Sequence, residues 1–538
     1  MNKITQLNHL IIIFLATSCL ICTDLHAQKT SKPNVLIIMT DQQRWDALGY
    51  AGNTEIKTPN MNRLAKEGAW FKNAYSACPV CVPARSVILT GHTIFNLKVL
   101  GNNDIDNDDI PNFQTFDQIL SDNGYRTEYY GKWHVPYQFA SKYNNVVKTT
   151  NKSTKTNVQT NVQGFREYLD KLGSPVRKAE NNELIDGMSL RPYVPLPIDG
   201  MYGIKAEDEP EGNVGKKGKK KPSTSQAQNF GVFNGPANAS LAAYEGIEAL
   251  EALKKMKPGK PFSLTCSFGP PHPPFVVPAK YAAMYNPNQL SVPASISDQL
   301  LNAPYQRGKA AFDQRFQNPE MVKQMKQVYY ALVTQVDEWV GQLLDELYRK
   351  GLTENTLVVF VSDHGEMMGD HGLNSKNKMY EGSVRIPMIM RFPGIIPAGA
   401  KVNTPVSHHD LFATILDYTG MKAPENDGRS LRNLIDGKAD NCDYAVSTWG
   451  QIKNGGPFMI RKGDWKMILF LQMSDKNQGA TQALYNLKSD PLEMNNLIGN
   501  NPEKTKYEKI AADLKQTLKD WMIKTKTPYL NELDNTNL

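Results

Sequence analysis

The chain has 538 residues, 40% of them hydrophobic and 21% charged, so it can form one large domain and a smaller one. This composition excludes a chain that is disordered throughout. A net charge of +7 and a pI near 8.8 favour anionic partners only weakly, because such an excess is common on a solvated surface.

The N-terminus carries Lys3 and then an apolar run over 10–16 that gives way to a polar stretch. This pattern is typical of a secretory signal peptide, here residues 1–27. The run is shorter than the roughly 18 apolar residues that a membrane span needs, and no later segment reaches that length. We therefore expect an exported protein, periplasmic or secreted. A lipoprotein acylated at Cys19 or Cys22 is less favoured, because neither cysteine has the expected aliphatic and small neighbours.

Strand and helix patterns alternate along residues 28–435. The apolar run 34–40 has no polar alternation, which is typical of a strand buried on both faces. Repeated helix-to-strand units follow it and predict an α/β fold with a mainly parallel sheet sandwiched by helices. The predicted helices are 58–68, 113–121, 241–257 and 320–350, and the last three lead into strands 126–130, 261–268 and 356–362.

Two parts of the chain break this pattern. Residues 148–236 are polar and glycine-rich and carry the basic run Lys216 to Lys221. They are interpreted as an irregular insertion, either functional or a solvated loop. After residue 435, short strands at 456–461 and 465–471 precede a helix at 503–524. That order predicts a smaller C-terminal α+β subdomain, 436–538, with an antiparallel sheet.

Polar residues directly follow two of the predicted strands. Asp41 and Gln42 follow the first, and Asp363 and His364 follow strand 356–362. Parallel strands place their carboxyl ends at one edge, where open α/β sheets bind their ligands. Two carboxylates, an amide oxygen and an imidazole gathered there could hold a hard divalent cation. Either pair alone is more often a helix cap or a turn.

Cys81 opens the segment CVPARSVILTG. Pro83 suits the first turn of a helix, so free amides at the helix start would face Cys81, and Arg85 would add a fixed positive charge. A plain structural helix could carry the same residues. Cys78 and Cys81 could also form a redox pair or half of a zinc site, but no second ligand pair stands out at short spacing, and Cys78 is better read as a small buried hydrophobe.

Three further segments offer ammonium or imidazole groups. If the Gly-Lys-Trp-His segment is extended, alternation places Lys132 and His134 on one side of it. His272 lies in a proline-rich turn after a strand, and Lys376, with Lys378 as its competitor, lies beyond the second acidic pair. Taken alone, each of these would be an ordinary surface or turn residue.

Together these residues make the chain resemble the type I, formylglycine-dependent sulfatases of the alkaline phosphatase superfamily. The resemblance rests on Cys-x-Pro-Ala-Arg followed by Leu-Thr-Gly at 81–91 and on residues 124–134, and it spans 34–497. It implies an alkaline phosphatase-like fold and the hydrolysis of sulfate esters. It also implies that a separate maturation enzyme oxidises Cys81 to formylglycine (3-oxoalanine).

The resemblance further implies a calcium ion and a sulfate site. Calcium would be bound by Asp41, Gln42, Cys81, Asp363 and His364. The sulfate would be surrounded by Arg85, Lys132, His134, His272 and Lys376. His272 is the first choice as general acid and Lys376 the second, while His134 would assist sulfate release. Gln42 and His364 replace the aspartate and asparagine common in the family, and the first change removes one negative charge from the metal site.

The favoured function is removal of sulfate from a sulfated carbohydrate, with algal polysaccharides such as ulvan preferred. Two alternatives stay open: a phosphonate monoester or phosphodiester hydrolase with the same nucleophile, and a non-catalytic protein that binds polyanionic glycans through its lysine run. No nucleic acid partner is expected. These motifs do not identify the sugar, because the signature residues bind the sulfate and the fold is shared by many specificities.

Overall fold

The computed structural model of the protein describes residues 32–140, 161–172, 188–191, 230–233, 236–273, 275–305, 314–450, 456–471 and 481–538. The expected signal peptide at 1–27 and the basic run from Lys216 to Lys221 lie outside the described residues. Within the described ranges, no helix combines the length and apolar character that crossing a membrane requires.

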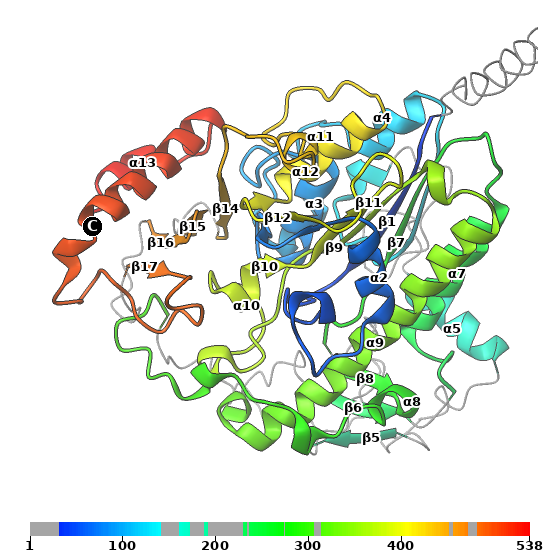
Figure 1. Cartoon of the computed structure of the whole chain (residues 1–538), viewed down its shortest axis with the longest axis horizontal. Coiled ribbons are helices and arrows are strands. Elements are labelled where there is room, and N and C mark those ends of the chain that lie inside the picture. Colours follow the sequence, from blue (N-terminus) through cyan, green and yellow to red (C-terminus); the bar gives the residue numbers. More distant parts are fainter. Residues whose placement is uncertain are drawn as a thin grey trace, which may run out of the picture.

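A seven-stranded sheet forms the centre of the molecule (Figure 1), in the order β12-β2-β11-β9-β1-β7-β4. Strands β9, β1, β7 and β4 run parallel, whereas β11 runs antiparallel to both of its neighbours. The prediction of a mainly parallel sheet is confirmed. The strands are β1 (Asn34–Thr40), β2 (Ala69–Phe71), β4 (Arg126–Gly131), β7 (Phe262–Ser267), β9 (Thr356–Ser362), β11 (Met388–Arg391) and β12 (Ala400–Val402).

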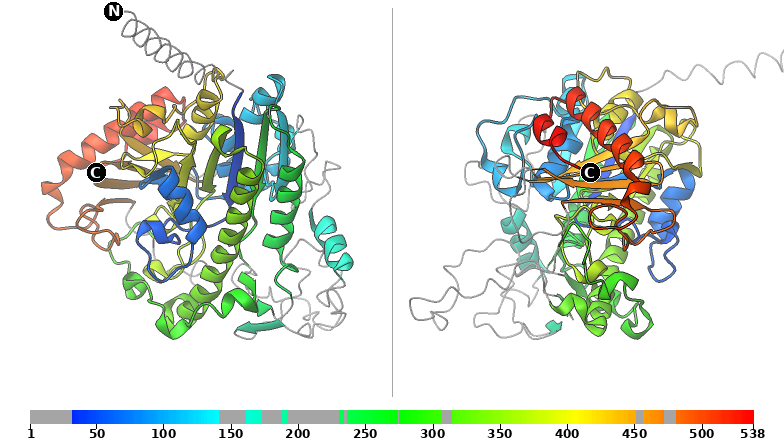
Figure 2. Two further views of the ribbon diagram at one scale, coloured as in Figure 1. Left: turned by 45° about the vertical axis from the view of Figure 1, so that its right-hand side comes forward. Right: turned by 90° about the vertical axis from the view of Figure 1, so that its left-hand side faces the viewer.

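Helices lie on both faces of the central sheet (Figure 2), and alternate residues of β1 belong to two different cores, one on each face. Leu36 and Ile38 pack with residues of α2 (Pro59–Glu67), α7 (Leu241–Lys255) and α9 (Pro319–Arg349). Val35 and Ile37 pack with residues of α3 (Cys81–Thr90), α4 (Phe116–Asp122) and α11 (His409–Tyr418). Each fully buried aliphatic side chain contributes about 1.5–3 kcal/mol. Burial on both faces explains the uninterrupted apolar run of this strand.

A second sheet of four antiparallel strands lies toward the C-terminal end of the chain (Figure 1), in the order β14-β15-β16-β17. Leu514, Leu518 and Trp521 of helix α13 cover one face of this sheet, and Met379 and Tyr380 pack against the other. The predicted antiparallel sheet is confirmed. The elements are β14 (Tyr444–Thr448), β15 (Pro457–Lys462), β16 (Trp465–Phe470), β17 (Gln482–Asn486) and α13 (Glu508–Lys524).

Parts of the segment 148–236 form regular elements, although its composition indicates an irregular insertion. Strand β6 (Phe230–Phe233) pairs with β5 (Met188–Arg191) and, in parallel, with β8 (Phe275–Pro278). Helix α5 (Asn161–Lys171) also belongs to this segment. Strand β6 is completed by a partner far along the chain, and local composition carries no signal of such pairing.

The remaining short elements connect these layers. Strands β10, β3 and β13 form a small sheet of their own. The bounds are β3 (Ala74–Tyr75), β10 (Arg385–Ile386), β13 (Val406–Ser407), α8 (Ala279–Ala282), α10 (Glu381–Val384), α12 (Arg432–Ile435) and α14 (Leu530–Asp534).

Candidate active site

The carboxyl ends of β1 and β9 bring three polar residues to one place, beside Cys81 of α3. Thr40 pairs with Ser362 in the parallel register, so the residues that follow the two strands are neighbours. Asp41, Asp363 and His364 are fully buried there, as is Cys81. Each of these four side chains offers a ligand atom, and the four atoms lie within 4.8 Å of one another. The arrangement has the dimensions of a site for a single metal ion.

Gln42 is held in a left-handed backbone conformation, with φ of 70°. Its N–H donates to Asp363 Oδ1 at 3.1 Å, and its carbonyl accepts a hydrogen bond from the Tyr329 hydroxyl at 2.7 Å. Its side-chain nitrogen donates to the carboxylate of Glu366. Its Oε1 is buried and has no hydrogen-bond partner. An unsatisfied buried carbonyl oxygen next to Asp41 fits a hard cation such as calcium, which prefers oxygen ligands.

The charges and the tautomer of the cluster also fit a cation. Burial and the charge of Asp41 raise the pKa of Asp363, and a divalent cation between the two carboxylates would remove this repulsion. The Nδ1 atom of His364 lies 2.9 Å from the carbonyl oxygen of Gly365, which places the imidazole proton on that nitrogen. Its Nε2 is thereby left as an acceptor that can bind a metal.

Cys81 is the first residue of α3 and lies at the centre of the cluster. Its Sγ is 2.8 Å from Lys376 Nζ, 3.2 Å from His364 Nε2 and 4.0 Å from Lys132 Nζ. Burial raises the pKa of this thiol, but the charges of Lys132, Lys376 and His364 outweigh burial and hold the pKa well below its usual range. The surroundings therefore stabilise negative charge on the side chain at position 81.

Cys78 lies in a different environment from Cys81. Burial raises the pKa of its thiol well above the usual range, and both cysteines are free. A redox pair needs a reactive thiol with an accessible partner, so the arrangement gives no support to the redox alternative. Cys78 instead packs with the apolar residues on the α3 side of the central sheet.

Arg85 lies one turn into α3 and is 1% exposed. Its Nε donates to Asp363 Oδ2 at 2.8 Å, and its Nη1 donates at 2.8 Å to both the Lys132 carbonyl and the Ser267 hydroxyl. Its Nη2 lies 3.5 Å from Asp41 Oδ2. The guanidinium thus braces the two carboxylates and the ends of β4 and β7. Its Nη2 is buried without a hydrogen-bond partner, and the sequence expectation that Arg85 helps to surround the sulfate stays a prediction.

Lys132 and His134 reach the cluster through a turn, and not through the extended segment that the sequence analysis assumed. Gly131 and His134 have φ of 89° and 47°. At Gly131 a Cβ would lie 1.9 Å from a carbonyl oxygen at the end of β7, so only glycine fits. Lys132 forms an ion pair with Asp41, and His134 is close enough to Cys81 for each side chain to influence the pKa of the other. Burial lowers the pKa of His134 to about 4, so its imidazole is neutral at pH 7.

His272 and Lys376 approach Cys81 from two other loops. The Nδ1 of His272 lies 2.6 Å from the carbonyl oxygen of Pro273, and the imidazole is close enough to Cys81 for that side chain to influence its pKa. Burial and the charges of the neighbouring lysines lower the pKa of His272. Lys376 contacts Cys81 directly, whereas Lys378 turns its Nζ to the Lys376 carbonyl at 3.3 Å. Of the two competing lysines, the fold therefore brings Lys376 to the site.

Three buried residues that the sequence analysis did not single out support this site. Tyr329 of α9 and Glu366 both hold Gln42, as described above. Glu245 of α7 accepts a hydrogen bond from the N–H of Gly269 at 2.9 Å, in the loop that leads to His272. Burial raises the pKa of Glu245 to about 8. No spacing rule marks these residues, because each contacts the site from a distant part of the chain.

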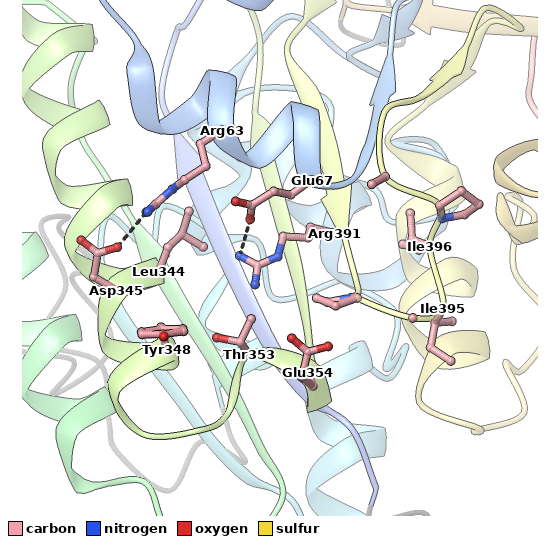
Figure 3. A pocket seen from close by; sticks show the side chains of 14 residues that line it. Arg63, Glu67, Leu344, Asp345, Tyr348, Thr353, Glu354, Arg391, Ile395 and Ile396 are labelled. Atoms are coloured by element: carbon pink, nitrogen blue, oxygen red, sulfur yellow. Dashed lines mark hydrogen bonds and ion pairs between the residues drawn. The ribbon is translucent and has the colours of Figure 1, made fainter. Parts of the chain in front are cut away.

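A cavity of about 900 Å³ lies at the opposite edge of the central sheet (Figure 3). Its two guanidinium groups are already paired, Arg63 with Asp345 at 2.9 Å and Arg391 with Glu67 at 3.3 Å. With Glu354, its lining has more carboxylates than guanidinium groups. An anionic substrate is therefore disfavoured here, whereas the lysines around Cys81 would attract one.

Residues 33–421 match the family model described as Sulfatase, and residues 369–524 match one described as N-sulphoglucosamine sulphohydrolase, C-terminal. An ulvan-active sulfatase of Formosa agariphila is 30% identical over 524 residues, which cover 95% of this chain and 86% of that protein.

Two solved structures share the fold, each at 21% identity and a TM-score of 0.68. One is a complex with its substrate D-glucosamine-2-N,6-O-disulfate, and the match covers 94% of this chain and 100% of that one. The other is a phosphonate monoester hydrolase of Agrobacterium radiobacter, with 92% and 96% covered.

Proposed function

This chain belongs to the sulfatase family and is a sulfuric ester hydrolase, and we propose that it removes sulfate from a sulfated carbohydrate through an oxidised Cys81 and a calcium ion. The observation that carries this proposal is the environment of Cys81. A fully buried thiol is surrounded by two ammonium groups and an imidazole, which together hold its pKa well below the usual range. Such surroundings favour an anion exactly where the nucleophile of a sulfatase would act.

Five residues are proposed to hold the metal. Asp41 and Asp363 supply carboxylates, Gln42 supplies the unsatisfied Oε1, and His364 supplies Nε2. The side chain at position 81 completes the set. Bound calcium would act as a Lewis acid on a sulfate oxygen, and hydrated formylglycine would supply an oxygen nucleophile in place of the thiol. Arg85 keeps the two carboxylates in place by hydrogen bonding and charge.

The remaining residues bind the sulfate and move protons. Lys132 and Lys376 both direct their Nζ atoms to Cys81 and would neutralise the oxygens of a bound sulfate ester. His272 is proposed as the general acid that protonates the departing alcohol oxygen. Burial and two lysines lower its pKa in the free protein, and the negative charge of a bound sulfate ester would raise that pKa again. His134, neutral at pH 7, can accept a proton when sulfate leaves.

The substrate class rests on the chain's relatives and on its expected export. A relative that covers nearly the whole chain is described as active on ulvan, a sulfated algal polysaccharide. The N-terminal residues have the pattern of a secretory signal, which suits an enzyme that meets polymers outside the cytoplasm. We therefore propose a periplasmic or secreted enzyme and favour algal polysaccharides as substrates.

Mass spectrometry tests the proposed nucleophile. Trypsin cuts after Lys72 and Arg85 and releases one peptide that contains both Cys78 and Cys81. Conversion of Cys81 to formylglycine lowers the mass of this peptide by about 18 Da. Cys78 serves as an internal control, because it should still take up one alkylating group. An active preparation in which both cysteines are alkylated would rule out the proposed nucleophile.

Two activity measurements test the metal and the reaction. We expect chelation to abolish aryl sulfate hydrolysis and calcium to restore it better than other divalent ions. Full activity in a metal-stripped sample would contradict the metal assignment. Sulfuryl and phosphoryl centres are nearly isosteric, so one site could accept either substrate. Rates on aryl sulfate, phosphonate monoester and phosphodiester substrates then show which reaction this site catalyses best. A larger kcat/KM on the phosphonate would favour that alternative.

A further inference from the structure

Glu366 lies two residues beyond His364 and is 1% exposed. One oxygen of its carboxylate accepts a hydrogen bond from the side-chain nitrogen of Gln42. The other oxygen accepts from the N–H groups of Met368, at 3.1 Å, and of Ser375. All three neighbours donate hydrogen bonds to the two carboxylate oxygens of Glu366, which accept them.

This contact decides which end of the Gln42 amide points into the metal site. The two ends of a primary amide have nearly the same shape, so packing alone does not distinguish them. A carboxylate distinguishes them, because it attracts the NH₂ group and repels the carbonyl oxygen. With its NH₂ group on Glu366, Gln42 directs Oε1 to the other side, where that atom is buried and unpartnered.

The same carboxylate also holds the loop that carries Lys376. Ser375 has φ of 61°, a left-handed conformation that is uncommon outside glycine, and Gln42 has φ of 70°. Glu366 therefore contacts two residues with strained backbone, Gln42 and Ser375. Strain of this kind persists only where surrounding contacts hold it.

We propose that Glu366 is a positioning residue, which orients the Gln42 amide so that its oxygen faces the metal and links that amide to the Lys376 loop. The inference rests on the proposed function, because it concerns Gln42 as a ligand. An acidic residue at position 42 would present an oxygen in either orientation and would not need this device. Glu366 thus compensates for an amide at a position where the family commonly has a carboxylate.

The test is the substitution Glu366→Gln in the full chain. The new amide can keep its oxygen on the two backbone N–H groups, which leaves its NH₂ group facing Gln42. Gln42 must then turn its own oxygen toward residue 366 and its NH₂ group toward the metal. Because NH₂ is not a metal ligand, we expect calcium affinity to fall by about 10- to 100-fold in calorimetric titration of metal-stripped protein.

Two further variants separate orientation from loss of charge. Asp370→Asn removes a carboxylate from the same loop, where Asp370 pairs with Arg44 at 2.8 Å and not with Gln42. We expect its calcium affinity to stay within about threefold of wild type. The double variant Gln42→Glu with Glu366→Gln keeps the total charge and restores an oxygen toward the metal. We expect it to recover wild-type calcium affinity or better.

Each outcome decides a different point. Equal losses in Glu366→Gln and Asp370→Asn would overturn the inference, because charge alone would then explain both. A double variant as weak as Glu366→Gln would also overturn it. If wild-type protein itself binds no calcium, the metal assignment under the proposed function fails, and this inference fails with it. Circular dichroism of the metal-free variants checks that each of them is folded.

Discussion

Among the described residues, two buried clusters of charged side chains differ in how their charges are paired. The Lys466 cluster consists of Glu381, Lys466 and Glu493, and it joins β16 to α10. The ammonium group of Lys466, which is fully buried, lies 2.9 Å from Glu381 and 2.7 Å from Glu493. Glu381 also pairs with Arg385 at 3.4 Å. Every charge in this cluster therefore has a partner of opposite sign from the same chain.

The Cys81 cluster, by comparison, contains polar atoms without a partner. It is defined as Asp41, Gln42, Cys81, Lys132, His134, Asp363, His364 and Lys376. Gln42 Oε1 and His134 Nδ1 are buried without a hydrogen-bond partner. Two ammonium groups converge on one thiol, which lowers its pKa. Buried polar atoms that their own chain leaves unsatisfied are costly, so their concentration at one sheet edge indicates a ligand site. Buried charge alone does not mark a functional site; here the site is marked by an unpartnered ligand oxygen, Gln42 Oε1, beside a thiol whose pKa is lowered by its neighbours.

The largest expected effect comes from removing the centre of the Cys81 cluster. Cys81→Ala should lower kcat/KM on an aryl sulfate by about 10⁴-fold or more, because no nucleophile remains. Cys78→Ala is the matched control, since that buried thiol has a raised pKa and lies among apolar residues. It should retain activity within about threefold. Comparable losses in the two variants would show that the segment matters for folding and not for chemistry.

A substitution in the Lys466 cluster should lower the stability of the protein and leave its catalytic rate unchanged. Lys466→Met leaves two buried carboxylates without their shared cation, so the free energy of unfolding should fall by about 3–5 kcal/mol in denaturant titration. Lys462→Met is the control on the neighbouring strand, because Lys462 is partly exposed and pairs with Asp443 at 3.4 Å. Its effect should stay below about 0.5 kcal/mol.

The contrast between the clusters would break if Lys466→Met lost kcat/KM while keeping its stability. Activity per folded molecule should instead stay within about threefold of wild type at a temperature where the variant remains folded. Both quantities can be measured on one preparation, with the folded fraction taken from the unfolding curve.

A smaller effect is expected within the Cys81 cluster itself. Lys376→Ala removes one of the two ammonium groups around Cys81 and should lower kcat/KM by about 10²-fold. Lys378→Ala is the matched control two residues later, because its Nζ faces the Lys376 carbonyl and not Cys81. Initial rates on an aryl sulfate distinguish the two lysines. The reverse result would mean that Lys378 is the one that binds the sulfate.

The smallest effect concerns Glu245 of α7. Its carboxylate is buried and has no ion-pair partner among the residues that the structure describes. Burial raises its pKa from 4.5 to about 8. Between these two pH values the unfolded chain has released this proton while the folded chain keeps it. The free energy of unfolding should therefore fall as pH rises across the window, with the loss complete above about pH 8.

The substitution Glu245→Gln tests this pH dependence. The amide keeps an acceptor for the Gly269 N–H and cannot ionise. Denaturant unfolding at pH 5.5 and pH 8.5 should show the variant gaining a few kcal/mol relative to wild type at the higher pH. Parallel pH profiles for the two proteins would show that Glu245 is ionised in the folded state.

Much of the fold and the identity of the cluster could be predicted because their signals are local. The uninterrupted run before Asp41 marks a strand buried on both faces, and the acidic pairs directly follow strands whose carboxyl ends meet. Segment 148–236 was less predictable, because β6 depends on the distant partner β8. The sequence predicts that Lys132 and His134 face one site because side chains alternate along an extended segment. In the structure they face it because the backbone turns at Gly131.

The sequence by itself determined the kinds of chemical group at the site and their order along the chain, because strand ends and helix starts are encoded by neighbouring residues. Only the tertiary structure decided how those groups are used. Lys376 and not Lys378 contacts Cys81 across 295 positions, and Glu366 orients Gln42 across 324. Arg85 braces carboxylates from two strands. Contacts between residues so far apart depend on the packing of the whole sheet, which no local pattern records.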